Sequence, residues 1–241
     1  MCGRFVIAKE LNEIQQLFEI DEAFWEGSLP NFNIAPTTQV PIFLERPESR
    51  SETGVGLGDS KRELHSARWG LVPHWAKAIE GSPLLNARIE SVLEKPSFRD
   101  AVSFRRCAIP ASGYYEWQDL GEGKLPHYIH PRDAMFAFAG IYSFWKDPAK
   151  AKDDPSRWLL SVAILTKDSA PELAEIHDRN PVFLSPDSLE AWLDPSYLTD
   201  LETLRGIANE SDAVAAELDF YPVSAAVGSV RAAGEDLIRP I

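Results

Sequence analysis

Four stretches decide the fold class of this chain: RRCAIPASGYYEWQ (105–118), LPHYIHP (125–131), MFAFAGIYSFW (135–145) and RWLLSVAILT (157–166). They are rich in aromatic and β-branched residues, and turn-forming segments such as DLGEGK (119–124) and KDPAKAKDDPS (146–156) separate them. This pattern is typical of antiparallel strands joined by hairpins. The middle of the chain is therefore predicted to be mostly β-sheet.

Helices are predicted near the two ends of the chain rather than between the strands. The first has an apolar face formed by Leu11, Ile14, Leu17 and Phe18. Ser185 and Pro186 are suited to the N-cap and first turn of a later helix, and Thr199 with Glu202 has the spacing of a capping box for the next one. Because strands and helices do not alternate, we expect an α+β fold built on antiparallel sheets rather than a parallel βαβ sheet.

The other segments complete a single domain. The sequence predicts a short strand at 2–7, a loop leading into a strand at 31–45, an irregular segment at 67–77 and a final strand at 219–224. Residues 46–64 and 146–156 show no periodicity, so we expect them to be mobile loops. No repeat and no linker divides the sequence, so one domain over residues 1–241 is expected.

The charge balance limits the classes of partner. Lys and Arg number 24 against 37 Asp and Glu, which gives a formal net charge of −13. Non-specific nucleic-acid binding comes mainly from phosphate neutralisation, so this balance argues against a general nucleic-acid coat. A local basic groove stays open, because several arginines lie in or beside the unusual motifs: Arg4, Arg68, Arg88, Arg99, Arg105, Arg106 and Arg179.

Membrane, secreted and metal-binding classes are not expected. The longest apolar stretch, around 135–142, is far shorter than the ~20 residues of a membrane span, and no secretory signal pattern is present. Two cysteines and five histidines show no metal-ligand spacing. We therefore expect a cytoplasmic protein without metal or cofactor, and nothing in the sequence demands more than a monomer.

Cys2 is the most informative single residue. A small residue at this position allows methionine aminopeptidase to remove Met1, so we expect mature chains to begin with Cys2. Its α-amine and thiol, with ordinary pKa values of ~7.7–8.0 and ~8.5, then lie on adjacent carbons. Such a 1,2-aminothiol condenses with an aldehyde to an imine and closes through sulfur into a thiazolidine. Ring closure has the advantage of an intramolecular reaction.

Three further segments combine residues that carry chemistry. They are LLNARIES (84–91) with Asn86 and Arg88, IPASGYYEW (109–117) with Glu116, and AEIHDRNPVFL (174–184) with His177 and Arg179. Asn86 and Arg88 point the same way if their segment is extended. Taken singly, each residue also has an ordinary structural explanation, as a turn, a solvated strand position, a core histidine or a salt-bridge partner.

Taken together, these segments resemble the SRAP family of SOS-response-associated peptidases, now understood as abasic-site processing proteins. The matching pieces cover nearly the whole chain: MCGRF (1–5), NIAP (33–36), WGLVPHW (69–75), NARIES (86–91), EKPSFRD (94–100), RRCAIPASGYYEW (105–117), FAFAGIY (136–142), ILT (164–166) and IHDRNPVFL (176–184). The resemblance implies an antiparallel, barrel-like β-sheet core flanked by helices. It also implies that Cys2 attacks the ring-opened aldehyde of an abasic site in single-stranded DNA, and that the resulting thiazolidine crosslink shields the lesion.

The resemblance also assigns roles. The catalytic set it implies is Cys2, Asn86, Glu116 and His177. Glu116 and His177 would move protons as the sugar opens and the amine condenses, while Asn86 would hold the sugar or the amine. The DNA-binding set comprises Arg4, Arg88 and Arg179 as phosphate clamps, Pro36, Trp69 and Trp117 as stacking or wedging groups, and Thr166 as a backbone contact. When bound to damaged DNA the protein would be nucleoid-associated.

The sequence departs from the family pattern at four positions, and other functions stay open. Asn180 stands in place of methionine, Tyr114 of tryptophan, Ile89 of alanine and Gly228 of asparagine. One alternative is an N-terminal-nucleophile hydrolase such as a glutamine amidotransferase domain, in which the free amine serves as base for the thiol. Another is a non-catalytic module that binds single-stranded DNA. The family's older interpretation, a Cys–Glu–His peptidase that cuts its own N-terminus, uses the same residues.

Overall fold

The computed structural model describes residues 3–47, 60–132, 135–196 and 199–241. Within them the chain forms fourteen strands, four α-helices and four short 3-10 helices. Strands dominate, and nearly all long pairings between them are antiparallel. The α+β class predicted from the sequence is confirmed. Among the described residues, no helix is both long enough and apolar enough to cross a membrane.

The elements have the following bounds. The strands are β1 (Phe5–Ile7), β2 (Glu22–Phe24), β3 (Asn31–Ile34), β4 (Gln39–Pro47), β5 (Ser60–Trp69), β6 (Asn86–Arg88), β7 (Arg106–Ala111), β8 (Gly113–Asp119), β9 (Lys124–Pro131), β10 (Phe136–Lys146), β11 (Trp158–Asp168), β12 (Arg179–Pro181), β13 (Phe183–Leu184) and β14 (Leu218–Pro222). The helices are α1 (Leu11–Leu17), α2 (Arg99–Phe104), α3 (Pro186–Leu193) and α4 (Leu201–Ala215), with 3-10 helices η1 (Ile89–Ser91), η2 (Pro155–Arg157), η3 (Ala225–Gly228) and η4 (Glu235–Ile238).

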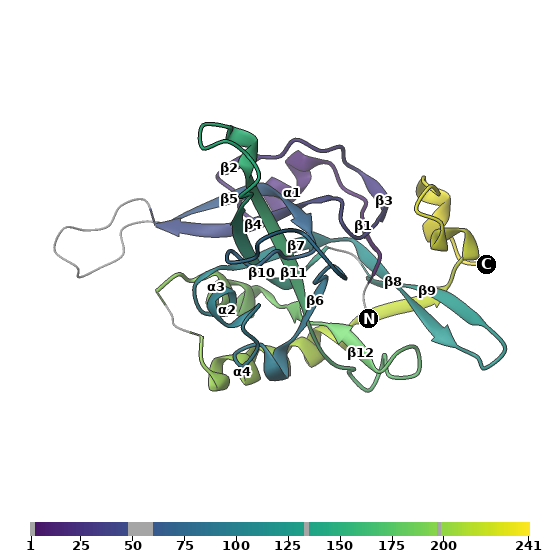
Figure 1. Cartoon of the computed structure of the whole chain (residues 1–241). Helices are drawn as coiled ribbons and strands as arrows, with labels where there is room; N and C mark the ends of the chain where they lie inside the picture. The colour runs from purple at the N-terminus through teal and green to yellow at the C-terminus, as the bar shows by residue number, and fades with distance from the viewer. Residues whose placement is uncertain (1–2, 48–59, 133–134, 197–198) are drawn as a thin grey trace.

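Five strands pair in a closed ring at the centre of the molecule (Figure 1). β10 pairs with both β11 and β7, β7 meets β4 at the pair Phe43–Ala108, and β4 pairs with β5 along its whole length. A short parallel contact between β5 and β11, which includes the pair Trp69–Val162, completes the ring. The barrel-like core expected from the resemblance is therefore confirmed.

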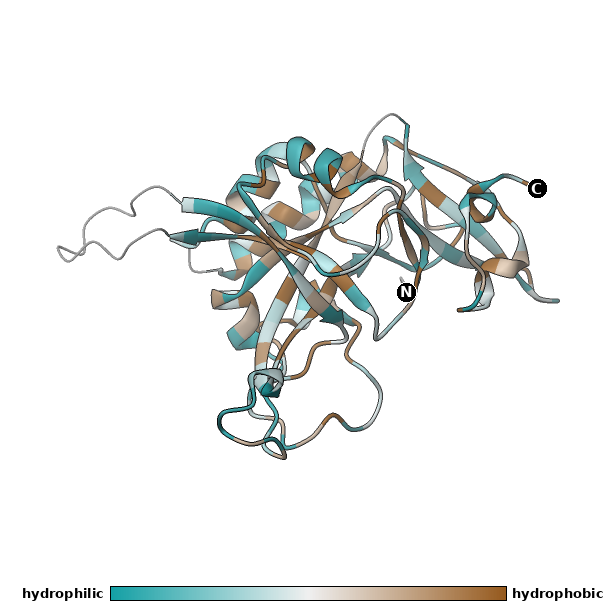
Figure 2. Cartoon of the chain, turned by 90° about the horizontal axis from the view of Figure 1, so that it is seen from above, coloured by the Kyte–Doolittle hydropathy of each residue, from teal (hydrophilic) through white to brown (hydrophobic). Residues whose placement is uncertain are grey.

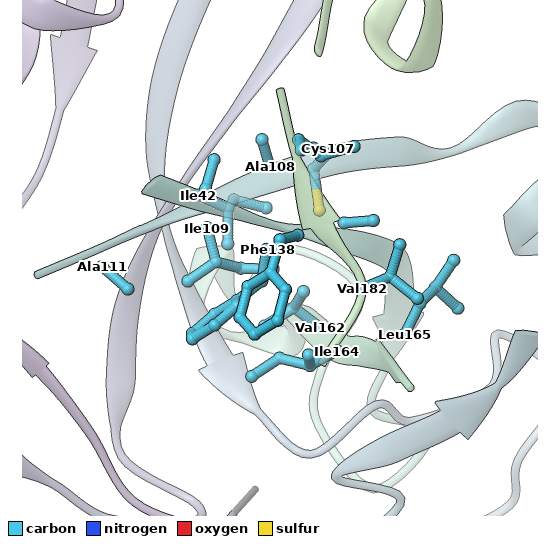
Figure 3. Packing of buried hydrophobic residues seen from close by; sticks show 14 of the residues in the cluster. Ile42, Cys107, Ala108, Ile109, Ala111, Phe138, Val162, Ile164, Leu165 and Val182 are labelled. Carbon is cyan, nitrogen blue, oxygen red and sulfur yellow. The ribbon is translucent and has the colours of Figure 1, made fainter. Parts of the chain in front are cut away.

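Apolar side chains from the strands fill the barrel (Figure 3). Phe138, Ile109 and Val162 are fully buried there. Gly140 on β10 allows β7 to approach closely, because a Cβ at this position would lie 2.3 Å from Cδ1 of Ile109. In Figure 2 hydrophilic and hydrophobic residues alternate along many strands and helices, as expected for elements with one buried face.

A second sheet, of order β14-β9-β8-β1-β3, carries the beginning of the chain. β1 lies between β8 and β3, and Phe5 pairs with Tyr114 on one side and Ile34 on the other. The ring of Phe5 meets that of Trp69 edge to face at 5.2 Å. The N-terminal strand is thus fixed on both edges and packed against the barrel.

The C-terminal residues, yellow in Figure 1, cover one face of this second sheet. Val223 and Val227 pack with Tyr115 and Tyr128 in a small apolar cluster separate from the barrel core. Burial raises the pKa of both phenols well above its ordinary value. The Tyr221 hydroxyl donates a 2.7 Å hydrogen bond to the carbonyl of Ile238 and so ties the end of the chain to β14.

The later helices begin close to the predicted positions, with one correction. The Ser185 side chain caps α3 by accepting from the Ser188 amide, as predicted. The cap of α4 is Asp200, whose carboxylate accepts from the Thr203 amide at 2.8 Å. The predicted capping role of Thr199 is wrong, because its hydroxyl instead accepts a hydrogen bond from the buried guanidinium of Arg106.

Two predicted loops are partly strand. Residues 31–34 form β3, because they pair with β1. The local sequence pattern does not predict this pairing. Residues 60–64 begin β5, whose pairing with β4 extends to Pro47 and Ser60; the expected mobile loop at 48–59 lies outside the described residues. At 146–156 the chain makes turns closed by a bond from the Asp147 amide to the Arg157 carbonyl.

Candidate functional site

β8 supplies the acidic residue of the candidate site. Side chains alternate along a strand, so Tyr114, Glu116 and Gln118 share one face of β8. The Glu116 side chain is only 5 % exposed. Burying a carboxylate is costly unless neighbouring groups compensate for the lost water. Glu116 is therefore not a solvated strand residue, and neighbouring groups must compensate for the water that its carboxylate has lost.

His177 comes from a different part of the chain. It lies near the end of residues 169–178, here called the histidine loop, which the Ser169 amide closes by donating to the Asp178 carbonyl at 2.9 Å. Leu173 and Ile176 anchor this loop in the hydrophobic core. The result is a distance of 4.0 Å between Nε2 of His177 and Oε1 of Glu116. The predicted acid–base pair is thus brought together.

The hydrogen bonds of His177 define where its proton lies. Its Nδ1 accepts a 3.0 Å bond from the Arg179 amide, so the neutral ring carries its proton on Nε2, the nitrogen that faces Glu116. Oδ1 of Asp178 also lies 2.8 Å from Nδ1, a contact that would need a proton on Nδ1. Asp178 is highly exposed and free to turn, whereas the backbone amide is fixed. The backbone bond therefore sets the neutral tautomer.

The N-terminal strand runs beside this pair. The Tyr115 amide donates a 2.9 Å hydrogen bond to the carbonyl of Arg4, so Arg4 lies alongside the residue that precedes Glu116. The Arg4 guanidinium is nearly buried and donates to the Gly228 carbonyl at 3.1 Å, and burial lowers its pKa. Cys2 itself lies outside the described residues.

β6 brings Asn86 and Arg88 to the end of β11. The two strands run parallel, with Asn86 opposite Ile164 and Arg88 opposite Thr166. β12 pairs with β11 as well, where Thr166 faces Pro181. The segments that contain Asn86 and His177 therefore converge at one end of β11. As predicted, Asn86 and Arg88 share a face of an extended segment; Asn86 is half-buried and Arg88 is exposed.

Arg179 is not placed as an unpaired phosphate clamp. Its guanidinium is 8 % exposed and makes two hydrogen bonds to the Glu90 carboxylate, of 3.0 Å and 2.9 Å. It also donates to Asp168 and to the carbonyl of Thr166. Burial opposes its charge, but these carboxylates outweigh burial and raise the pKa of Arg179. Its charge joins η1, β11 and β12, and the phosphate contact expected from the sequence stays a prediction.

Two predicted DNA contacts are inaccessible. Trp69 is fully buried and its indole N–H donates to the Leu85 carbonyl at 3.1 Å, so its ring offers no face to a base. Thr166 is also fully buried, between β6 and β12. These two assignments are corrected. Pro36, in a turn, and Trp117, packed beside the small apolar cluster, are half-buried and keep some exposed surface.

The exposed tryptophan of the WGLVPHW segment is Trp75, which the sequence reasoning missed. Its side chain is 57 % exposed, and the next residue is held by a 2.7 Å bond from the Trp145 indole to the Ala76 carbonyl. No local signal separated the two tryptophans, because the whole of 67–77 was expected to be irregular. In the structure Trp69 is the last residue of β5 and packs in the core, whereas Trp75 lies beyond the strand.

Comparison with known protein families assigns the chain. The family model described as "SOS response associated peptidase (SRAP)" matches residues 1–230. The chain is a member of the SRAP family. Glu116, His177, Asn86 and Arg88 all lie within the matched region, as do Cys2 and Arg4.

Curated SRAP relatives are similar over most of their length. The chain is 34% identical to the abasic site processing protein YoqW of Bacillus subtilis over 243 residues, covering 99% of both chains. It is 28% identical to YedK of Escherichia coli, with full coverage of both. Identity to HMCES of Gallus gallus is 30%, over 88% of this chain and 66% of the relative. All three relatives are named abasic site processing proteins.

Solved structures share the SRAP fold of this chain. A protein from Bacteroides thetaiotaomicron superposes with a TM-score of 0.79 at 23% identity, covering all of both chains. A protein from Bordetella bronchiseptica gives 0.67 at 20% identity, over 92% of this chain. At these sequence identities, the similarity shows a shared fold only.

Proposed function

We propose that this protein joins itself covalently to abasic sites in single-stranded DNA through Cys2, after removal of Met1. The observation that carries the proposal is the 4.0 Å approach of His177 to the buried Glu116 beside the N-terminal strand. Family membership and relatives named for abasic-site processing support the same substrate class. An abasic site is the natural substrate for an aminothiol, because its open sugar presents an aldehyde.

The chemistry balances without any further reactant. The amine nitrogen of Cys2 attacks C1′ of the open sugar, and the carbonyl oxygen leaves as water to give an imine. The sulfur then attacks the same carbon, while the thiol proton passes to the nitrogen. One aldehyde and one aminothiol thus give one thiazolidine and one water. Arg4, which follows Cys2 by two residues in the sequence, lies beside Tyr115, the residue that precedes Glu116.

Glu116 and His177 would divide the proton transfers. The carboxylate of Glu116 is suited to take a proton from the sugar hydroxyl or the attacking amine. The Nε2 proton of His177 faces the same place and is suited to reach the ring oxygen as the sugar opens. Asn86, half-buried on β6, would hold the sugar or the amine through its amide.

DNA would approach through the exposed groups near this pair. Arg88 is exposed and suited to bind a phosphate, and the half-buried Trp117, next to Glu116 in the sequence, keeps some surface for stacking on a flanking base. Arg4, nearly buried and bonded to the C-terminal segment, contributes a charge whose position is fixed. These contacts are few, which fits a small binding surface on a chain of net charge −13.

The test is incubation with single-stranded DNA that contains one abasic site, followed by a denaturing gel. Wild-type protein should give a heat-stable adduct. Cys2→Ser and Cys2→Ala keep a free α-amine, so borohydride can trap their imine, but neither can close the sulfur ring. A heat-stable adduct of Cys2→Ala at the wild-type yield would refute the thiazolidine. An N-terminal-nucleophile hydrolase or a simple DNA-binding module would give no stable adduct.

Intact-mass measurement separates aminopeptidase processing from self-cleavage. Ala is as small as Cys at position 2, so aminopeptidase should remove Met1 from wild type and from Cys2→Ala alike. Retention of Met1 in Cys2→Ala alone would instead support the peptidase interpretation, in which the thiol cuts its own N-terminus. An added residue before Cys2 that aminopeptidase cannot remove should abolish the stable crosslink.

A further inference from the structure

Gln118 connects the strand that carries Glu116 with the loop that carries His177. It lies two residues beyond Glu116 on β8, so the two side chains share a face of the strand. Its Nε2 donates a 3.0 Å hydrogen bond to the carbonyl of Glu175. Glu175 lies two residues before His177. One amide therefore ties the histidine loop to β8 next to the acid–base pair.

The other contacts of the histidine loop do not hold its exposed side, which faces β8 and Gln118. Leu173 and Ile176 fix the opposite side of the loop in the core. Asn180 holds the beginning of the loop, because its Oδ1 accepts a 2.7 Å bond from the Ala170 amide. Glu172 and Glu175 are exposed. Hydrogen bonds at the exposed side of a loop open more readily than those in the core.

We propose that Gln118 is a positioning residue for the reaction, which sets the separation of His177 and Glu116 by holding the Glu175 carbonyl against β8. This inference rests on the proposed function of the pair. At 4.0 Å the imidazole and carboxylate are just beyond direct hydrogen-bond distance, so a small outward shift of the loop would remove His177 from the reacting atoms. A misplacement of about 1 Å can cost about 100-fold in rate.

If Gln118 has this positioning role, the effect of replacing it depends on His177. If Gln118 acts by placing His177, its removal should matter only while His177 is present. A residue that merely stabilises the fold would have the same effect whether or not the imidazole is there. A double-mutant cycle measures this difference directly. Binding to undamaged DNA should not change, because Gln118 offers no charge to a phosphate.

The experiment uses Gln118→Met, which keeps the length of the side chain but removes its N–H donor. Gln16→Met is the matched control, because Gln16 is exposed on α1. Single-turnover crosslinking rates are measured from about pH 5 to about pH 9, across the range in which imidazole titrates. Each variant is made in the wild-type and the His177→Ala background, with thermal melting and binding to undamaged single-stranded DNA as parallel measurements.

We expect Gln118→Met to slow crosslinking about 10-fold or more and to flatten the part of the pH profile that His177→Ala also flattens. In the His177→Ala background it should have no further effect, and Gln16→Met should match wild type throughout. Equal rates for Gln118→Met and wild type, or an equal loss in both backgrounds, would overturn the inference. Absence of crosslinking by wild type would instead refute the proposed function, so the two failures are distinguishable.

Discussion

At the scale of single residues, the environment of each charged side chain decides its role. Glu116 is buried beside an imidazole, whereas Arg88 is exposed and Arg179 is enclosed by carboxylates. Residues of the same type thus have different surroundings, which suit them to different roles in the proposed function. Arg88 and Arg179 were expected to act alike, and the structure separates them.

Glu116→Gln and His177→Ala should each slow crosslinking without abolishing it. General acid–base groups contribute about 10²–10⁴-fold, whereas the finished thiazolidine is held by covalent bonds that need neither residue. His177→Ala should also slow release, because reopening the ring requires a proton at the leaving atom. Single-turnover rates of formation, and of transfer to a competing abasic strand, provide the measurement. If both variants match wild type in both rates, the assigned acid–base roles are wrong.

Arg88→Ala should weaken DNA binding, whereas Arg179→Ala should lower the stability of the fold. Loss of an exposed phosphate contact should reduce the salt dependence of binding to single-stranded DNA by about 0.7–1 in slope. Loss of Arg179 should leave that slope nearly unchanged and destabilise the fold by about 1–3 kcal/mol, because the buried carbonyl of Thr166 loses its hydrogen-bond donor. Salt titrations and thermal melting of both variants decide this. A reduced slope in Arg179→Ala would restore it as a phosphate clamp.

Sequence reasoning indicated which residues come together better than it indicated how they are buried. Glu116 and His177 were predicted as a pair because their residue types suit proton transfer, and their 4.0 Å approach agrees with that prediction. The exposure of Trp69 was wrongly predicted, because burial depends on how β5 packs on β1. The partners of Arg179 could not be read either, since Glu90 is distant in the sequence and becomes a neighbour only through the pairing of β6, β11 and β12.

At the scale of elements, short segments from distant parts of the chain are held by polar side chains. The Glu90–Arg179 pair joins η1 to β12, and Asn180 fixes the beginning of the histidine loop. Asn180 is one of the departures from the usual family pattern, and its buried amide has a structural role here. Of these attachments, the Glu90–Arg179 pair contains a group that titrates in acid.

Glu90→Gln should lower the melting temperature at neutral pH and have less effect in acid. Burial opposes ionisation of Glu90, but hydrogen bonds from Arg179 outweigh it, so its pKa is lowered. A carboxylate with a lowered folded-state pKa contributes stability above its unfolded value, near ~4.3, and loses it as pH falls through the folded value. The melting temperatures of the two proteins should therefore converge as the pH falls through the lowered folded-state pKa of Glu90. A difference that stays constant down to acid pH would contradict this.

The elements with local signals were predicted well, and those that depend on distant partners were not. The strands between 105 and 166 and the cap of α3 follow from hairpin patterns and local hydrogen bonds. β3 exists because β1 pairs with it, and Thr199 lost its predicted capping role to a distant arginine. Neither partner is visible within a short window of sequence.

At the scale of the whole molecule, the barrel depends on close packing between β7 and β10. Gly140→Ala should destabilise the fold by about 1–3 kcal/mol, because the added Cβ would lie 2.3 Å from Cδ1 of Ile109. For a chain of this size each kcal/mol corresponds to a shift of about 2–4 °C in melting temperature. Gly206→Ala is a matched control, since nothing lies within 4 Å of the Cβ position there. An unchanged melting temperature for Gly140→Ala would show that the strands can separate at no cost.

The pairing of Phe5 with Tyr114 has a consequence for the newborn chain. Ribosomes add about 5–20 residues per second, so β1 emerges several seconds before its partner β8, and His177 follows roughly 10–35 s after the start of synthesis. During that interval the N-terminus cannot yet be built into its sheet and stays accessible to aminopeptidase. An aminothiol released early would still lack Glu116 and His177. Under the proposed function, the order of translation therefore allows the N-terminus to be processed first and delays its reactivity until the chain is nearly complete.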